Sequence, residues 1–163
     1  MHRIFRHLLY LTLAAILQTT WVHHIEIFEI QPDLILLVLV LIGATAGHIE
    51  ATIFGFGVGL FQDAYAPADL GLNAFTKSII GFAIGLGRSG VMIDTLHVRL
   101  FLVCGAVLVH DLIYYIGHGE IALADVPYYW LRYGIGRAFY SGLIAAMIIS
   151  VFDIRRRYVG DEG

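Results

Sequence analysis

The chain has 163 residues, of which 59% are hydrophobic and 14% charged, with a mean hydropathy of +0.80 and a net charge of −3. Soluble domains carry about 25% charged residues, so one core of this size cannot take up all the apolar side chains, and the composition indicates a membrane protein whose surplus is covered by the lipid bilayer. The small net charge excludes a nucleic-acid partner, and the single cysteine, Cys104, excludes a disulfide framework and a zinc cluster.

Six apolar segments follow along the chain and predict an all-α integral membrane protein, with six transmembrane helices in one bundle and a single domain over 1–163. They lie at about 8–22, 34–47, 51–66, 73–87, 100–117 and 133–152. A basic stretch precedes the first segment, as in a signal peptide, but no small-residue cleavage site precedes Trp21, so we expect a retained helix. The second, third and fourth segments are shorter than the roughly 20 residues of a full crossing, so they must use flanking residues, be buried by the other helices or thin the bilayer locally.

Only residues 48–50 separate the second and third segments, which could instead form one interrupted span. The distribution of arginines between the two sides of the membrane decides between six spans and five. With six spans, one side of the membrane holds both termini and seven arginines: Arg3, Arg6, Arg88, Arg99, Arg155, Arg156 and Arg157. With five, the cluster at 155–157 would lie opposite Arg3 and Arg6. Basic residues concentrate on the cytoplasmic side, so we expect six spans with both termini cytoplasmic.

Glycines spaced four apart occur at 43/47, 55/59 and 81/85, one pair in each of the three short segments. In lipid, small residues at an interface let helix backbones approach closely. We therefore expect the three central helices to pack closely against one another. In particular, Gly55 and Gly59 should face another helix, either of this bundle or of a partner.

Ionisable residues within or beside the apolar segments are costly in a membrane and usually face the protein interior. Asp63 and Lys77 lie near the outer ends of the third and fourth segments. Asp111 lies late in the fifth segment and Arg137 early in the sixth, hence at similar depth. We expect two ion pairs, Asp63 with Lys77 and Asp111 with Arg137. The alternative interpretation is a proton or ligand site, in which His110 could take part.

No residue pattern indicates catalysis. The histidines lack the H-E-x-x-H spacing of a zinc site, and no serine lies in a G-x-S-x-G elbow. We therefore expect no enzyme, no metal and no cofactor.

Two stretches resemble the bacterial rod-shape-determining membrane protein family MreD. Pro32 and Asp33, followed by a leucine-rich run, are similar to the family's P-[DN]-x-[LV]-L-L segment. The series Gly55-Phe56, Gly59-Leu60, Asp63 and then Leu70-Gly71-Leu72-Asn73 is similar to its G-F-x-x-G-x-[LI]-x-D run, turn and L-G. Residues 64–69 depart from the family's Ser/Gly-rich turn, while Asp111 sits where the family tends to have it.

The resemblance implies a non-enzymatic scaffold subunit of the bacterial cell-elongation machinery, multi-pass in the cytoplasmic (inner) membrane. It implies an MreC-like single-span partner and, indirectly, an MreB-like filament, a SEDS-family glycosyltransferase and a class B penicillin-binding protein, which act in peptidoglycan synthesis. The candidates for structural or partner-binding roles are Pro32, Asp33, Gly55, Gly59, Asp63, Gly71, Asn73, Lys77, Asp111 and Arg137.

The family's six-helix architecture looks like that of the substrate-binding S-components of vitamin importers. A small-molecule (vitamin-type) binding subunit of an importer is therefore the alternative hypothesis. Such a binder needs an outer cavity with a few convergent polar groups. A scaffold needs only an apolar groove with small residues.

Overall fold

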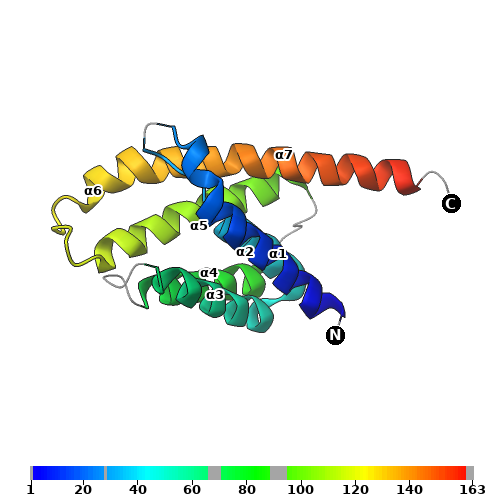
Figure 1. Ribbon diagram of the computed structural model, residues 1–163, viewed down its shortest axis with the longest axis horizontal. Coiled ribbons are helices and arrows are strands. Elements are labelled where there is room, and N and C mark those ends of the chain that lie inside the picture. The colour runs from blue at the N-terminus through cyan, green and yellow to red at the C-terminus, as the bar shows by residue number, and fades with distance from the viewer. Residues whose placement is uncertain (1, 28, 66–70, 89–94, 161–163) are drawn as a thin grey trace.

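The computed structural model describes residues 2–27, 29–65, 71–88 and 95–160, and the regular structure in these ranges is helical (Figure 1). The elements in chain order are α1 (His2–Thr20), the 3₁₀ helix η1 (Val22–Ile25), α2 (Leu34–Ala46), α3 (His48–Asp63), α4 (Leu72–Gly87), α5 (Leu96–Gly117), α6 (Val126–Tyr129), the π-helix η3 (Trp130–Gly134) and α7 (Ile135–Gly160). Each predicted segment corresponds to one helix, and the last is the continuous run α6–η3–α7. The all-α prediction is confirmed for the described residues, which include no strand.

Helix α2 lies at the centre of the bundle because it is apolar on every side. Its sequence LILLVLVLIGATA carries no charge, and more than half of its residues are buried. It contacts α1, α3, α4, α5 and α7. A helix that is hydrophobic all round is one that other elements surround. With 13 residues it is about 20 Å long, shorter than the roughly 30 Å bilayer core, and the neighbouring helices cover it, which is one of the three alternatives for a short segment.

Helices α3 and α4 form an antiparallel hairpin with the most extensive helix contact in the structure. A Cβ atom added to Gly55 would collide with the backbone carbonyl of Lys77, and one added to Gly59 would collide with the backbone of Ala74. From the other side, Gly81 and Gly85 lie against the backbone of α3 in the same way. The predicted close packing is confirmed for both glycine pairs, because a methyl group at any of these positions would push the two helices apart.

The third pair of glycines, 43/47, serves two different purposes. Gly43 lies against the side chain of Ile84, so it contributes to helix packing. Gly47 has a φ of +99° and ends α2 directly before α3 begins. Only glycine adopts this backbone conformation without strain, so Gly47 makes the sharp turn between the two helices, and its backbone also lies against Gly85 of α4.

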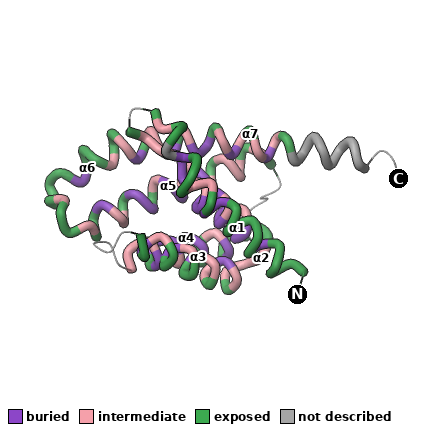
Figure 2. The backbone as a smooth tube through the Cα atoms, viewed as in Figure 1, coloured by how far each residue is buried: buried purple, intermediate pink, exposed green. Residues whose placement is uncertain are grey.

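Apolar side chains cover much of the outer surface. Figure 2 shows buried positions turned toward the middle of the bundle and exposed positions along the outer faces of the helices. In the described chain, two helical stretches are long and apolar enough to cross a membrane, Leu96–Gly117 and Val126–Val151. The large apolar residues that remain exposed on these helices, among them Phe101 and Phe139, form a surface suited to lipid or to another apolar helix.

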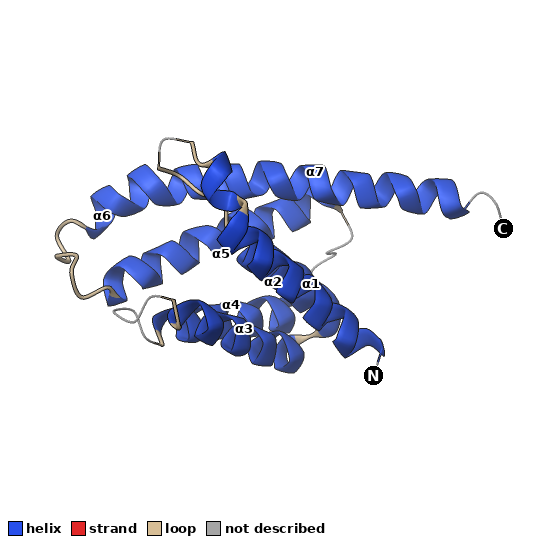
Figure 3. Cartoon of the chain, viewed as in Figure 1, coloured by secondary structure: helices blue, strands red, loops and turns tan. Residues whose placement is uncertain are grey.

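The two ends of the described chain lie toward the same end of the helix bundle. In Figure 1 the first turn of α1 and the last turn of α7 lie toward the same end of the molecule, while α4 begins and α5 ends at the opposite end, here called the distal end. Figure 3 shows short loops where the connection is described, between α2 and α3 and between α5 and α6.

Replacing Gly59 with leucine should destabilise the protein, because its Cβ would meet the backbone of α4, which cannot rotate away. Overpacking a tight site typically costs about 1–3 kcal/mol, and more where backbone is the obstacle. Gly57 is the matched control, because it lies on the same helix with open space around its Cβ position. We expect Gly59→Leu to lower the melting temperature in detergent by several degrees and Gly57→Leu to leave it nearly unchanged. Equal melting temperatures for the two variants would contradict the packing described here.

Candidate functional site

Charged and polar side chains meet inside the bundle between α2, α4, α5 and α7. The cluster consists of Asp33, Asn73, Lys77, His110, Asp111, Arg137 and Ser141. Lys77 and Asp111 have no exposed surface, and His110 and Asp33 are also buried. Arg137 is the most accessible charged member, with 29% of its side chain exposed. Such a concentration of buried charge inside a predicted membrane bundle is the strongest candidate for a functional site.

Lys77 lies at the centre of this cluster. Its Nζ is 2.9 Å from Nε2 of His110, 3.3 Å from Oδ1 of Asn73 and 3.5 Å from Oδ2 of Asp33. An ammonium group has three hydrogens to donate and no acceptor, so its three neighbours must all accept. With Lys77 charged, Nε2 of His110 is the acceptor, which corresponds to the neutral imidazole with its proton on Nδ1.

This assignment links His110 to Asp111. Nδ1 of His110 lies 3.1 Å from Oδ1 of Asp111 and, in this tautomer, donates a hydrogen bond to that oxygen. The same oxygen accepts a hydrogen bond of 3.0 Å from Nη1 of Arg137. The predicted ion pair between Asp111 and Arg137 is thus present. Hydrogen bonds run from Lys77 through His110 to Asp111, and two cations balance two carboxylates.

The second carboxylate oxygen of Asp111, Oδ2, differs from the first in its hydrogen bonding. Oδ2 is buried and has no hydrogen-bond partner among the described residues. It faces Gly134, the last residue of the π-helix η3, where an added Cβ would lie 3.6 Å from it. π-helical turns inside α-helices occur frequently at functional sites. Here the turn brings a glycine beside Asp111, so no side chain from this position covers the carboxylate.

Asp33 combines two roles at the start of α2. Its Oδ1 accepts a hydrogen bond of 2.7 Å from the backbone N–H of Leu36 and so caps the helix. Its Oδ2 faces the ammonium group of Lys77. The backbone N–H of Asp33 donates to Oγ of Ser141, at 3.0 Å, which ties the start of α2 to α7. Pro32, its neighbour, accepts a hydrogen bond of 3.0 Å from Gln18 of α1 through its carbonyl oxygen.

The predicted pair between Asp63 and Lys77 is wrong. The Asp63 carboxylate instead accepts three backbone N–H bonds, each of 3.0 Å, from Gly71, Asn73 and Ala74. The first N–H groups of a helix have no partner within it, and a carboxylate placed there also meets the positive end of the helix dipole. Gly71, with a φ of +90°, has no side chain that could cap α4, so Asp63 supplies the cap from α3.

The ten predicted candidates therefore separate into three groups. Asp33, Asn73, Lys77, Asp111 and Arg137 belong to the buried cluster; Asp63 caps α4 and binds the backbone N–H of Gly71 at its start; Gly55, Gly59 and Pro32 hold helices together. Sequence reasoning missed Ser141 and Gln18, and it left the role of His110 undefined. The only available signal was a polar residue within an otherwise apolar segment, which does not reveal its partner.

An aromatic column continues from the cluster toward the distal end. The rings of His110 and Tyr114 stack with centroids 6.0 Å apart, and those of Tyr114 and His118 with centroids 5.5 Å apart. Trp130 of η3 donates through Nε1 to the carbonyl oxygen of Leu108, at 2.8 Å. This bond fixes the π-helix against α5 and thereby holds Gly134 beside Asp111.

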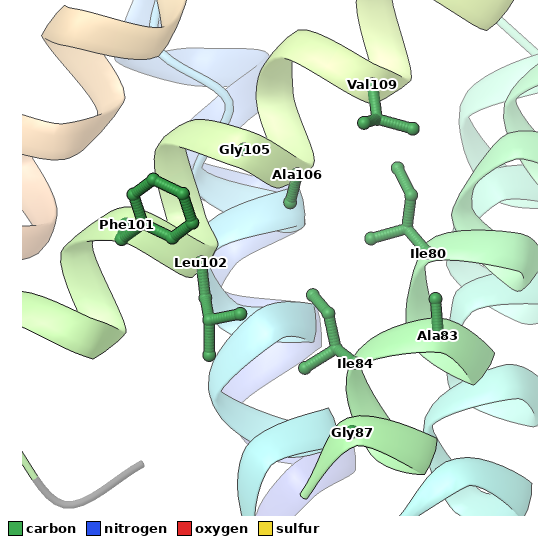
Figure 4. A pocket seen from close by; sticks show the side chains of 9 residues that line it. All are labelled: Ile80, Ala83, Ile84, Gly87, Phe101, Leu102, Gly105, Ala106 and Val109. Carbon is green, nitrogen blue, oxygen red and sulfur yellow. The ribbon is translucent and has the colours of Figure 1, made fainter. Parts of the chain in front are cut away.

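A separate apolar groove with a volume of about 270 Å³ lies between α4 and α5 (Figure 4). It is lined by apolar residues of α4 between Ile80 and Gly87 and of α5 between Phe101 and Val109. A small-molecule site normally contains several polar groups that orient its ligand, and this groove presents none from its lining side chains. Within the described ranges, no three His, Cys, Asp or Glu side chains gather as metal ligands.

Comparison with known protein families identifies a match. A protein-family model described as rod shape-determining protein MreD matches residues 1–130. No curated protein matches the chain. No solved structure matches it either.

Removing one partner of the Asp111–Arg137 pair should destabilise the protein, because it leaves an uncompensated charge in a poorly hydrated site. In protein interiors this costs about 3–5 kcal/mol, and snorkelling of the arginine toward water can reduce it. We expect Asp111→Asn and Arg137→Gln each to lower the melting temperature in detergent. The double variant should lose less than the sum of the two, since no lone charge remains. Additive losses would show that the pair does not interact in solution.

Proposed function

The chain belongs to the MreD family of rod shape-determining proteins, and we propose that it is a non-enzymatic scaffold subunit of the bacterial cell-elongation machinery. The family is one of membrane proteins with a role in determining rod shape. The observation that carries the proposal is the family match, which covers residues 1–130. On this proposal the chain holds an MreC-like single-span protein in the bacterial inner membrane.

The architecture supports a scaffold. All the described elements belong to one helical bundle built around α2, and its buried charges bind one another rather than line an open cavity. Tight α3–α4 packing and the paired charges of the buried cluster stabilise one arrangement of these helices. A rigid apolar surface can hold a partner's transmembrane helix in a fixed position with little loss of conformational freedom. Further contacts would be indirect, with an MreB-like filament, a SEDS glycosyltransferase and a class B penicillin-binding protein that synthesise peptidoglycan.

We propose six membrane spans, formed by α1, α2, α3, α4, α5 and the run α6–η3–α7, with both termini in the cytoplasm. The first turn of α1 and the last turn of α7 lie toward the same end of the molecule, which supports an even number of crossings. The arginines at residues 3, 6, 88, 99 and 155–157 favour the cytoplasm for that side. The short helix α2 lies among longer neighbours, which reduces the apolar surface that it must present to lipid.

The vitamin-binding alternative receives no specific support. A binder needs an outer cavity in which polar groups converge on the ligand. The groove between α4 and α5 has an apolar lining, and the polar groups of the cluster are directed at one another.

Purification in mild detergent tests the scaffold directly. A tagged copy of the chain, recovered from its own bacterial membranes, should bring down one single-span protein in a stoichiometric amount, identified by mass spectrometry. An unrelated multi-span protein with the same tag is the control. Recovery of a bound vitamin-like molecule without any single-span protein would contradict the scaffold and favour the importer subunit.

Reporter fusions test the topology. Alkaline phosphatase is active only outside the cytoplasm, so a fusion after Gly119, between α5 and α6, should be active. Fusions after Gly47 and after Gly160 should be inactive, because both positions face the cytoplasm in the six-span arrangement. Activity after Gly160 would rule out an even number of spans.

A further inference from the structure

Arg132, near the outer end of the run α6–η3–α7, is an exception to the charge distribution of the chain. In the proposed six-span arrangement, the outer connections at 23–33, 67–72 and 118–132 contain six acidic residues and no other lysine or arginine. Basic residues are depleted on this side of a membrane protein. The side chain of Arg132 is exposed, so it does not neutralise a buried carboxylate as Arg137 does. Its presence there indicates a role at the surface.

Two tyrosines hold the guanidinium group of Arg132 in place. Its Nη1 donates a hydrogen bond of 2.6 Å to the hydroxyl oxygen of Tyr128. Its central carbon lies 5.9 Å from the ring centroid of Tyr128 and 5.3 Å from that of Tyr133, within the range of cation–π attraction. The carboxylate of Glu29 accepts a hydrogen bond of 3.2 Å from Tyr133, and Arg132 forms no ion pair within the described part of the chain. The arginine is thus oriented while most of its five N–H groups stay available.

Arg132 and Tyr128 together form a donor site for an anion. Because the hydroxyl oxygen of Tyr128 accepts from Arg132, its own proton can be donated to a further acceptor. The planar guanidinium group binds a phosphate or a carboxylate through two parallel hydrogen bonds. Both side chains are exposed, so an anion can reach them from outside the bundle.

The surface directly beyond Arg132 is apolar. Ile135 and Phe139 follow it at intervals of three and four residues, so they lie on the same side of the run, and they are 48% and 69% exposed. The apolar stretch Val126–Val151 is about 39 Å long as a helix, longer than the roughly 30 Å hydrocarbon core, so its outer end reaches the phospholipid headgroups. Going into the membrane, this side of the run presents first a cation and a hydroxyl group and then two large apolar side chains.

We propose that Arg132 and Tyr128 bind the phosphate group of a phospholipid in the outer leaflet, and that one acyl chain of this lipid lies along Ile135 and Phe139. A phospholipid presents an anionic phosphate and an apolar chain in the same order along the membrane normal. An acidic segment of a partner protein would match the guanidinium group but not the apolar side chains below it. The inference goes beyond the proposed function and depends only on its topology.

Native mass spectrometry of the purified chain in mild detergent tests the site. The probe is dioleoylphosphatidylglycerol, and the occupancy of the first bound lipid is measured. Arg132→Gln should weaken binding by roughly tenfold, because it removes charge-assisted hydrogen bonds. Its melting temperature without lipid should stay close to that of the wild type, because the side chain is exposed. Arg3→Gln is the matched control and should leave lipid binding unchanged, because Arg3 is also exposed but already pairs with Glu50 at 2.8 Å.

Three further comparisons identify the chemistry and the position of the lipid. Dioleoylglycerol has the same acyl chains without the phosphate and should bind the wild-type chain no better than the phospholipid binds Arg132→Gln. Tyr128→Phe removes only the hydroxyl group and should cause a smaller loss than Arg132→Gln. A phosphatidylglycerol with a photoreactive group on its acyl chain should crosslink to the peptide that contains Ile135 and Phe139, and Arg132→Gln should reduce this crosslink in proportion to the lost binding.

Equal binding of the phospholipid by the wild type and Arg132→Gln would overturn the inference and leave the scaffold and its topology standing. Equal binding of dioleoylglycerol and the phospholipid by the wild type would have the same meaning. Loss of a co-purifying protein from Arg132→Gln with unchanged lipid binding would show that the anion belongs to a protein instead. An inactive phosphatase fusion after Gly119 would reject the outer position of Arg132, and the outer-leaflet lipid with it, whatever the result of the binding measurement.

Discussion

The ammonium group of Lys77 is completely buried, and a buried charge costs several kcal/mol unless partners surround it. Its partners come from three places in the chain: Asp33 before α2, Asn73 on α4 itself and His110 on α5. These contacts fix how α4 rotates and how deeply it lies against α2 and α5. Through His110 the constraint reaches Asp111 and Arg137, so the start of α7 is held by the same set of charges.

Two kinds of helix contact follow from this arrangement. Where the helices carry glycines, as between α3 and α4, their backbones touch and the contact is stabilised by close packing along its length. Between α4 and α5 the contact includes the Lys77–His110 hydrogen bond near the distal end, and an apolar groove lies between the two helices beyond it. Part of the apolar face of α5 is therefore left uncovered by the described residues.

A scaffold needs an interior that does not change and a surface that another protein can cover. Mutual pairing of the buried charges stabilises one arrangement of the helices, because any shift would leave a carboxylate or an ammonium group alone in an apolar site. Among the described residues, Oδ2 of Asp111 beside the π-helix is the one buried polar atom of this cluster without a hydrogen-bond partner. A paired polar interior toward the distal end and an apolar groove nearer the chain ends thus occur in one bundle.

Composition and spacing determined the all-α bundle, the position of each helix and the glycine contacts at 55 and 59, because these depend on local apolar runs. They also determined the Asp111–Arg137 pair, because chain direction places both residues at similar depth. The family motif was also readable from the sequence, since it is a matter of residue order. Only the tertiary structure decided that Asp63 caps α4 and that Lys77 turns to Asp33 and His110. Those pairings depend on the rotation of each helix about its axis and on which helices become neighbours, and a hydrophobic pattern specifies neither. The same holds for the groove, which arises from the angle between two helices.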